Sequence, residues 1–189
     1  YTINPWGRDK EEEYKINTLN ERQYGGTLSW MEADGSDEEQ TDGIVATEAV
    51  EQLEKFSKNG PNFFLAVGFF KPHTPFVAPK KYYNLYNKEE IFIPKSSSRY
   101  LKTIPISAAK SVRAKKNQLD LEENLAKEIK LAYYSTISFV DAQLGRIINK
   151  LKQTGLDKNT IVVFISDHGY HMGEHGHWQK QTLFENATK

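Results

Sequence analysis

Cysteine is absent from this 189-residue chain, and neither sign of charge predominates. Without cysteine, these residues contain no disulfide, no thiolate metal site and no cysteine nucleophile. Lysine and arginine together number 25, as do aspartate and glutamate, so no overall basic field attracts nucleic acid or an anionic membrane. No apolar run approaches the roughly 18 residues that a membrane-spanning helix needs. We therefore expect no nucleic-acid partner and no membrane span.

The length predicts one globular domain, or a large part of one, with enough residues to bury a core. Residues 1–40 are polar and rich in turn formers, which predicts a surface loop region. The hydrophobic pattern begins after them, so we expect the core within residues 41–189. No repeat of solenoid period is present.

Two stretches have the spacing of amphipathic helices. In residues 41–60, apolar side chains recur every three or four positions from Ile44 to Phe56 before a glycine-proline stop. In residues 121–155 the same spacing runs from Leu121 to Leu151, and Gly155 marks the end.

Two other stretches predict β-strands. Residues 62–69 and 160–166 are continuous apolar runs rich in aromatic or β-branched residues, typical of strands buried on both faces of a parallel sheet. Strand, helix and strand alternate, which predicts an α/β fold with a mainly parallel sheet flanked by helices. Residues 79–120 are basic and polar and predict an extended surface excursion.

Four of the five histidines lie within residues 168–177, directly after the second predicted strand. Ligands of open α/β sheets gather beyond the carboxyl ends of strands, where Asp167 and His168 stand. A carboxylate and an imidazole there can bind one divalent cation, and composition alone leaves magnesium, manganese or zinc open beside calcium. The alternative is that Asp167 caps the next segment and the histidines form a solvated loop.

The stretch HMGEH, residues 171–175, matches the H-x-x-E-H pattern of inverted zinc metallopeptidases. In those enzymes the two histidines lie one turn apart on a helix. Gly169, Gly173 and Gly176 would each cost a helix about 1 kcal/mol. We therefore expect a loop here and not a peptidase site.

His73 and Lys180 complete the candidate residues. His73 follows the first predicted strand between two prolines that fix the backbone, and Lys180 follows the histidine-rich loop. Together they can supply a proton donor and a fixed cation for an anionic ester. The alternatives are a rigid turn residue for His73 and, for Lys180, a surface lysine in or before a helix through residues 182–187.

Three long segments resemble the sulfatase branch of the alkaline-phosphatase superfamily, and especially its iduronate-2-sulfatase-like members. They are FFLAVGFFKPHTPF (residues 63–76), YSTISFVDAQLGR (134–146) and IVVFISDHGYHMGEHGHWQK (161–180). The resemblance covers most of residues 41–189. It implies that residues 1–189 are part of an alkaline-phosphatase-like sulfatase catalytic domain.

Residue by residue, the resemblance implies roles for the candidates. Asp167 and His168 resemble two calcium ligands, with magnesium as an alternative. His73 resembles the histidine that protonates the departing alcohol, and Lys180 resembles the lysine that holds the sulfate. His171 and Trp178 are further candidates for substrate binding, and Trp178 either stacks on a sugar ring or packs under the loop.

The family's formylglycine nucleophile arises from a Cys-x-Pro-x-Arg or Ser-x-Pro-x-Arg motif, and neither occurs here. The adjacent aspartate pair that would supply the other metal ligands is also absent. We therefore expect an internal segment of a longer sulfatase, with the remainder of the catalytic domain as its partner. Alone, the segment should be inactive and should bind calcium weakly.

The expected function of the complete protein is that of a calcium-dependent sulfuric ester hydrolase acting on sulfated saccharides. Iduronate-2-sulfate units of glycosaminoglycans are one candidate substrate. The alternatives are a phosphate or phosphonate monoesterase of the same superfamily and a non-catalytic glycan-binding homologue. The resemblance also implies a periplasmic or secreted protein, although residues 1–8 contain no signal pattern.

Overall fold

The computed structural model describes residues 14–20, 26–60, 62–96, 99–112 and 118–188. The chain divides into two units. The first comprises Tyr1–Tyr86 and Ala132–Val163, and the second comprises Asn87–Leu131 and Phe164–Lys189. Each unit is described by itself. In the ranges given above, no helix combines the length and the apolar character needed to cross a bilayer.

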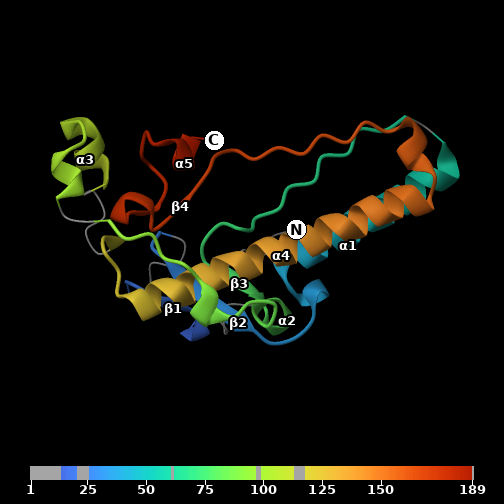
Figure 1. Cartoon of the computed structure of the whole chain (residues 1–189). Coiled ribbons are helices and arrows are strands. Elements are labelled where there is room, and N and C mark those ends of the chain that lie inside the picture. Colours follow the sequence, from blue (N-terminus) through green and yellow to red (C-terminus); the bar gives the residue numbers. More distant parts are fainter. Residues whose placement is uncertain (1–13, 21–25, 61, 97–98, 113–117, 189) are drawn as a thin grey trace. The chain divides into compact units, whose positions relative to one another are not determined.

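A three-stranded sheet lies in the first unit, and Figure 1 labels all of its strands. Its central strand β2 (Ser29–Ala33) pairs antiparallel with β1 (Asn17–Thr18) and parallel with β3 (Phe76–Pro79). Four of the five residues of β2 are buried, so the prediction of a surface loop over residues 1–40 is wrong here. The sequence SWMEA mixes polar and apolar residues and gives no strand pattern. The strand is nevertheless buried because its side chains pack in the core.

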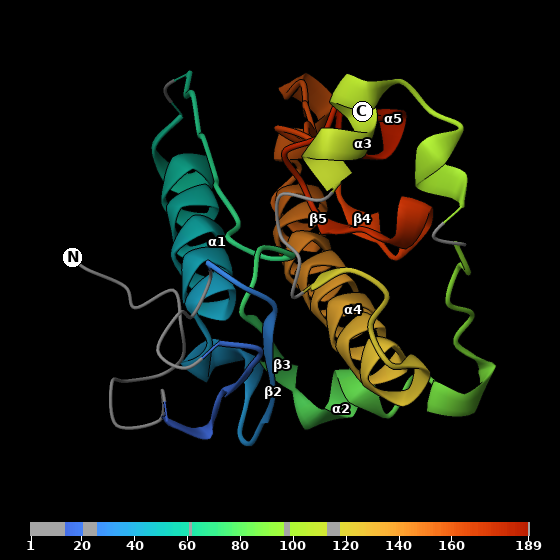
Figure 2. The ribbon, with the colours of Figure 1, turned by 90° about the vertical axis from the view of Figure 1, so that its left-hand side faces the viewer.

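Two long helices of the first unit pack against each other; Figure 1 shows one in front of the other, and Figure 2 shows both in full. They are α1 (Thr41–Asn59) and the part of α4 (Glu123–Gln153) that follows residue 131, and they confirm both helices predicted from apolar spacing. Gly60 ends α1 with a φ of 65°, a left-handed conformation that glycine adopts without strain. The buried contact between the helices is formed by Ala46, Ala49, Leu53, Ile147 and Leu151.

Residues 62–69 do not form the predicted buried strand. They are extended, without strand pairing, and Figure 1 shows them as a long thread without an arrow. Phe63, Leu65, Val67 and Phe69 pack partly against the core of the two helices, whereas Phe64 is 93% exposed. One face of the segment is thus covered and the other is open. A run buried on both faces needs a second layer, which the described residues do not provide.

Residues 160–166, the second predicted strand, differ in the same way. They are extended and unpaired, and Ile161 and Ile165 are 91% and 82% exposed. The described pairings are one parallel, between β2 and β3, and two antiparallel. The described residues combine helices with a small mixed sheet, which agrees with the predicted α/β class, but neither of the two apolar runs that suggested this class is paired.

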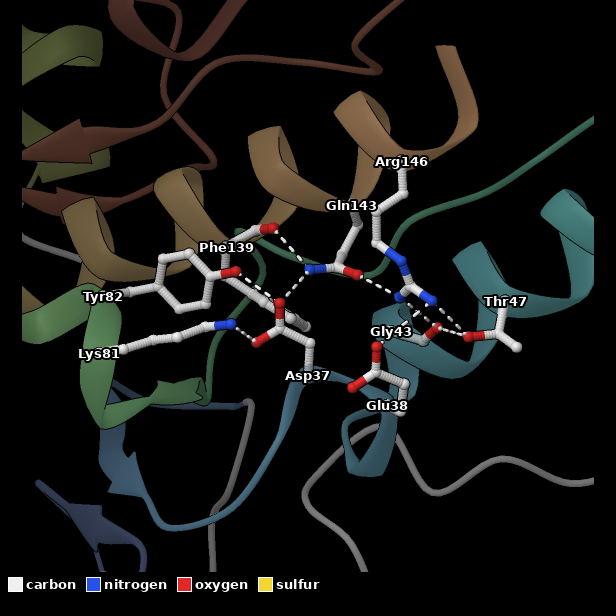
Figure 3. Close-up of polar contacts among 9 residues, drawn as sticks. All are labelled: Asp37, Glu38, Gly43, Thr47, Lys81, Tyr82, Phe139, Gln143 and Arg146. Carbon is white, nitrogen blue, oxygen red and sulfur yellow. Dashed lines mark hydrogen bonds and ion pairs between the residues drawn. The ribbon is translucent and has the colours of Figure 1, made fainter. Parts of the chain in front are cut away.

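Asp37 connects three elements of the first unit (Figure 3). It begins the 3-10 helix η2 (Asp37–Glu39) and is 8% exposed. The Tyr82 hydroxyl donates to its Oδ2 at 2.6 Å, and Nε2 of Gln143 donates to the same oxygen at 3.0 Å. The ammonium of Lys81 lies 2.8 Å from Oδ1. The carboxylate thereby ties η2 to α2 (Lys80–Tyr83) and to α4.

Arg146 extends this network to α1 (Figure 3). Its guanidinium donates to Oε1 of Gln143 and to Oγ1 of Thr47, both at 2.8 Å, and to the carbonyl oxygen of Gly43 at 3.3 Å. The backbone of Gly43 is close to η2, and a β-carbon there would lie 1.7 Å from the Asp37 carbonyl oxygen. Only glycine fits at this contact. The first unit is completed by η6 (Leu156–Asn159).

The second unit consists mainly of short elements. Strands β4 (His171–Met172) and β5 (Trp178–Gln179) form a two-stranded antiparallel sheet. The other elements are η3 (Lys88–Glu90), η4 (Tyr100–Lys102), α3 (Ile106–Val112), the first turns of α4, η7 (Glu174–Gly176) and α5 (Glu185–Thr188).

Residues 79–120 are more structured than the predicted surface excursion. Their described part includes α2, α3 and the 3-10 helices η3 (Lys88–Glu90) and η4 (Tyr100–Lys102), and Ile91 and Val112 are 6% and 0% exposed. Helices of one or two turns contain too few residues to show a clear hydrophobic period. The buried positions of this stretch therefore could not be predicted from its basic and polar composition.

Candidate functional site

The histidine-rich loop forms a hairpin in the second unit. His171 on β4 lies opposite Gln179 on β5, and the turn between the strands passes through left-handed backbone at Gly173 and His175. No α-helix spans residues 171–175, as predicted from the glycines. His171 and His175 have separate partners: Nε2 of His171 bonds Oγ1 of Thr182 at 2.8 Å, and Nδ1 of His175 bonds the Tyr100 hydroxyl at 2.7 Å. The helical zinc-peptidase geometry is absent.

Lys180 and His168 are in direct contact beside Asp167. The Lys180 ammonium donates to Nε2 of His168 at 2.8 Å, and Nδ1 of the same ring donates to the Gly169 carbonyl oxygen at 2.7 Å. The second bond assigns the ring hydrogen to Nδ1 and makes Nε2 the acceptor. Oδ2 of Asp167 lies 3.2 Å from Nε2, and its side chain is 84% exposed. Three of the residues singled out in the sequence therefore meet at one place.

His168 and Asp167 have some of the properties of ligands of a divalent cation. Nε2 of His168 carries a lone pair, and the Asp167 carboxylate is open to solvent, which are the two properties that metal ligands need. The Lys180 ammonium already lies against Nε2, so the position accepts positive charge. Within the described ranges, no group of three or more His, Cys, Asp or Glu side chains could hold a metal. Asp167 and His168 alone would therefore give an incomplete coordination shell.

His171 and Trp178 are both buried. His171 is 0% exposed and Trp178 is 1% exposed. Burial lowers the pKa of His171 to about 4 because it disfavours the charged ring; His177 and His175 act in the same direction and Glu174 opposes them. In this structure neither ring is open to a ligand. Of the two interpretations of Trp178, burial favours packing under the loop.

His73 belongs to the first unit, where it lies on a tight turn between residues 70 and 76. Its backbone N–H donates to the Phe70 carbonyl oxygen at 3.1 Å, and its Nδ1 donates to the Thr74 carbonyl oxygen at 2.6 Å. Because a carbonyl oxygen only accepts, Nδ1 carries a hydrogen in this contact. The structure therefore brings Asp167, His168 and Lys180 together, with His73 in the other unit.

Two buried charged residues beside the His73 turn were missed from the sequence. The Asp42 carboxylate accepts the backbone N–H groups of Phe70 and Lys71, each at 2.8 Å. Burial raises the pKa of Asp42 although these two bonds oppose it. The Lys71 ammonium donates to the Pro75 carbonyl oxygen at 2.5 Å, and burial lowers its pKa to about 7 against the opposing charge of Asp42. Asp42 resembled an ordinary acidic residue of a first helical turn, so nothing in the sequence indicated this contact.

Comparison with known proteins gives a consistent family. A model of the sulfatase family matches residues 2–189. A sulfatase from Formosa agariphila is 42% identical over 146 residues, which are 72% of this chain and 28% of that protein. Iduronate 2-sulfatase from Mus musculus is 35% identical over 153 residues, which are 75% of this chain and 28% of that protein.

A solved structure also matches. Phosphonate monoester hydrolase of Agrobacterium radiobacter is similar with a TM-score of 0.70 and 25% identity, over 83% of this chain and 33% of that one. The chain thus spans 28% of the length of the two sulfatases and 33% of the hydrolase. The resemblance recognised in the three sequence segments is confirmed, and the chain belongs to the sulfatase family.

Proposed function

We propose that the complete protein is a sulfatase that hydrolyses sulfate esters of saccharides. The observation that carries this proposal is the contact of Lys180 with His168 beside Asp167, in a chain of the sulfatase family. It combines a fixed ammonium with two candidate metal ligands at the end of one extended segment. A dianionic or monoanionic ester group requires such a concentration of positive charge.

In this proposal Asp167 and His168 hold a divalent cation, with calcium favoured by the family resemblance and magnesium as the alternative. When bound, such an ion would draw negative charge from the oxygens of the ester. The tautomer of His168 suits this role, since Nδ1 donates to Gly169 and the lone pair of the ring lies on Nε2. That lone pair accepts the Lys180 ammonium in this structure, so metal binding would require Lys180 to move from Nε2 toward the ester.

Lys180 would bind a sulfate oxygen through its ammonium. Its present contact with His168 Nε2 places the ammonium next to the proposed ligands, within reach of the same anionic group. In its protonated form, with a hydrogen on both ring nitrogens, His73 would donate the Nε2 hydrogen to the departing alcohol oxygen and become neutral, while Nδ1–H stays bonded to the Thr74 carbonyl oxygen. His171 and Trp178 are proposed to stabilise the conformation of the histidine-rich loop and not to contact the substrate, because both are buried.

The attacking group, expected to be a formylglycine, would come from outside these 189 residues. A sulfated saccharide is the proposed substrate because the relatives include iduronate 2-sulfatases from Mus musculus and Homo sapiens. A periplasmic or secreted location is proposed on the same likeness.

The test is a hydrolysis assay of the complete enzyme, matured so that its nucleophile is formed. We expect release of sulfate from sulfated mono- and disaccharides, together with a large loss in Lys180→Ala and none in the control Lys158→Ala, an exposed lysine. Absence of sulfate release would overturn the proposal. Saccharide binding without turnover would indicate a non-catalytic homologue.

A second candidate is a phosphonate or phosphate monoesterase. It is favoured by the similarity of the fold to the phosphonate monoester hydrolase of Agrobacterium radiobacter. The ratio of kcat/KM for matched sulfate and phosphonate esters separates the two. A sulfatase should have the higher kcat/KM on the sulfate ester, and a phosphonate monoesterase should have the higher kcat/KM on the phosphonate ester.

A further inference from the structure

The turn that carries His73 is fixed at its start by a buried carboxylate from another element. Asp42 lies in the first turn of α1 and is 1% exposed. Its Oδ1 accepts the N–H of Phe70 and its Oδ2 accepts the N–H of Lys71, both at 2.8 Å. Two charge-assisted bonds from one planar group restrict both the position and the orientation of this backbone.

The same turn is fixed after His73 by a hydroxyl. Oγ1 of Thr74 accepts the backbone N–H of Ser29 on β2 at 3.2 Å and donates to the carbonyl oxygen of Thr27 at 3.1 Å. Thr74 is 3% exposed, so these bonds are sheltered from water. The two anchors lie on either side of His73, one on α1 and one on the sheet.

These anchors determine where the imidazole points. The backbone oxygen of Thr74 accepts the Nδ1 hydrogen of His73 at 2.6 Å, so the position of Thr74 sets both the tautomer and the ring orientation. The His73 N–H in turn bonds the oxygen of Phe70, whose own N–H is held by Asp42. Displacement of either anchor would move the ring relative to anything it protonates.

We propose that Asp42 and Thr74 are positioning residues for His73, which hold its Nε2 in the place where a departing alcohol takes up a proton. This inference rests on the proposed function. A general acid contributes in proportion to how much the leaving group needs a proton. Loss of positioning should therefore reduce cleavage of a sugar sulfate, whose alcohol is a poor leaving group. It should spare an aryl sulfate such as 4-nitrophenyl sulfate, whose phenolate leaves unaided.

The experiment measures kcat/KM of the complete enzyme on these two esters. Asp42→Asn keeps the shape of the side chain but turns one acceptor into a donor that faces a backbone N–H. We expect it to lower the sugar sulfate value by about 10-fold or more and the aryl sulfate value by less than about 3-fold. His73→Ala should show the same pattern with a loss of about 100-fold, and the double variant should lose no more than His73→Ala.

Matched variants separate positioning from folding. Asp37→Asn also removes a buried carboxylate of the first unit, but one bonded to Lys81, Tyr82 and Gln143, so it should affect both esters equally. Thr74→Val should reproduce the selective loss and Thr74→Ser should restore activity, which keeps the test decisive if Asp42→Asn does not fold.

The two failures are distinguishable. If His73→Ala does not discriminate between the esters, the role of His73 in the proposed function is wrong. If His73→Ala discriminates but Asp42→Asn and Thr74→Val lower both values alike, or neither, the positioning role is overturned and the proposed function stands.

Discussion

Gly43 on α1 and Asp37 on η2 meet so closely that a β-carbon at Gly43 would lie 1.7 Å from the Asp37 carbonyl oxygen. We expect Gly43→Ala to lower the free energy of unfolding by at least about 1–3 kcal/mol, because α1 or η2 must shift to admit the methyl group. Urea denaturation measures this change.

Gly145→Ala is the control. No heavy atom outside its own helix would lie within 4 Å of the new β-carbon, and alanine stabilises a helix by about 1 kcal/mol relative to glycine. Equal effects of the two substitutions would contradict the contact.

Asp37 should make the stability of the protein sensitive to acid. Burial acts to raise the pKa of Asp37, but hydrogen bonds from Lys81, Tyr82 and Gln143 outweigh it and lower the pKa below 3.8. A lowered carboxyl pKa contributes stability that is present above about pH 4 and is lost as pH falls through the folded value. Asp37→Asn should lower stability at neutral pH by about 1–3 kcal/mol and flatten the decline below about pH 4.

Unfolding free energies measured across the acid range test this expectation. Glu38→Gln is the comparison, since Glu38 forms only a partly exposed ion pair with Arg146, at 3.4 Å. If the unfolding free energy of Asp37→Asn still declined as steeply below about pH 4 as that of the unsubstituted protein, another group would be responsible for the decline.

His171 predicts a separate pH dependence. Its folded pKa of about 4 lies below the ordinary 6.5, so the folded state binds fewer protons in that interval. The stability that follows is complete above pH 6.5 and is lost progressively as pH falls toward 4. His171→Gln, which cannot titrate, should remove this part of the decline in urea denaturation. A decline of the same slope in the variant would contradict the buried neutral ring.

Asp167 and Lys180 should differ in the property that they affect. In the complete enzyme, Asp167→Asn should lower metal affinity and turnover together, because it removes a proposed ligand. Lys180→Ala should not lower metal affinity, because it removes a cation that competes for Nε2 of His168, and it should cost about 2–4 kcal/mol in kcat/KM through weaker binding of the anionic group. Metal titration and steady-state kinetics measure the two effects. Near-normal activity in either variant would contradict the site.

The helices could be predicted from the sequence because their signal is local. The apolar spacing from Ile44 to Phe56 and from Leu121 to Leu151 already specifies one face of each helix, and both helices form. Strand pairing is not local. The runs at residues 62–69 and 160–166 show the expected extended backbone, but an apolar run does not say which strand lies beside it. Strand β2 was missed for the converse reason, since its place comes from its neighbours β1 and β3.

In the candidate site, too, the contacts between residues close in sequence were predicted and the long-range contacts were not. Asp167, His168 and Lys180 are close in sequence, and the structure brings them together. The contact of Asp42 with Phe70 and Lys71 joins positions 28 and 29 residues apart, and a single sequence has no pattern that marks it. A buried acid at the start of a helix looks the same in sequence whether it caps that helix or holds a distant turn.

The network around Asp37 also sets an order of events during protein synthesis. Asp37 and Gln143 are 106 positions apart, and Gly43 and Arg146 are 103 apart. At roughly 5–20 residues per second, a ribosome needs about 5–20 s to make the chain between them. During that interval α1 has emerged but its partner on α4 does not exist, and the apolar face that later contacts Ile147 and Leu151 is open to chaperones.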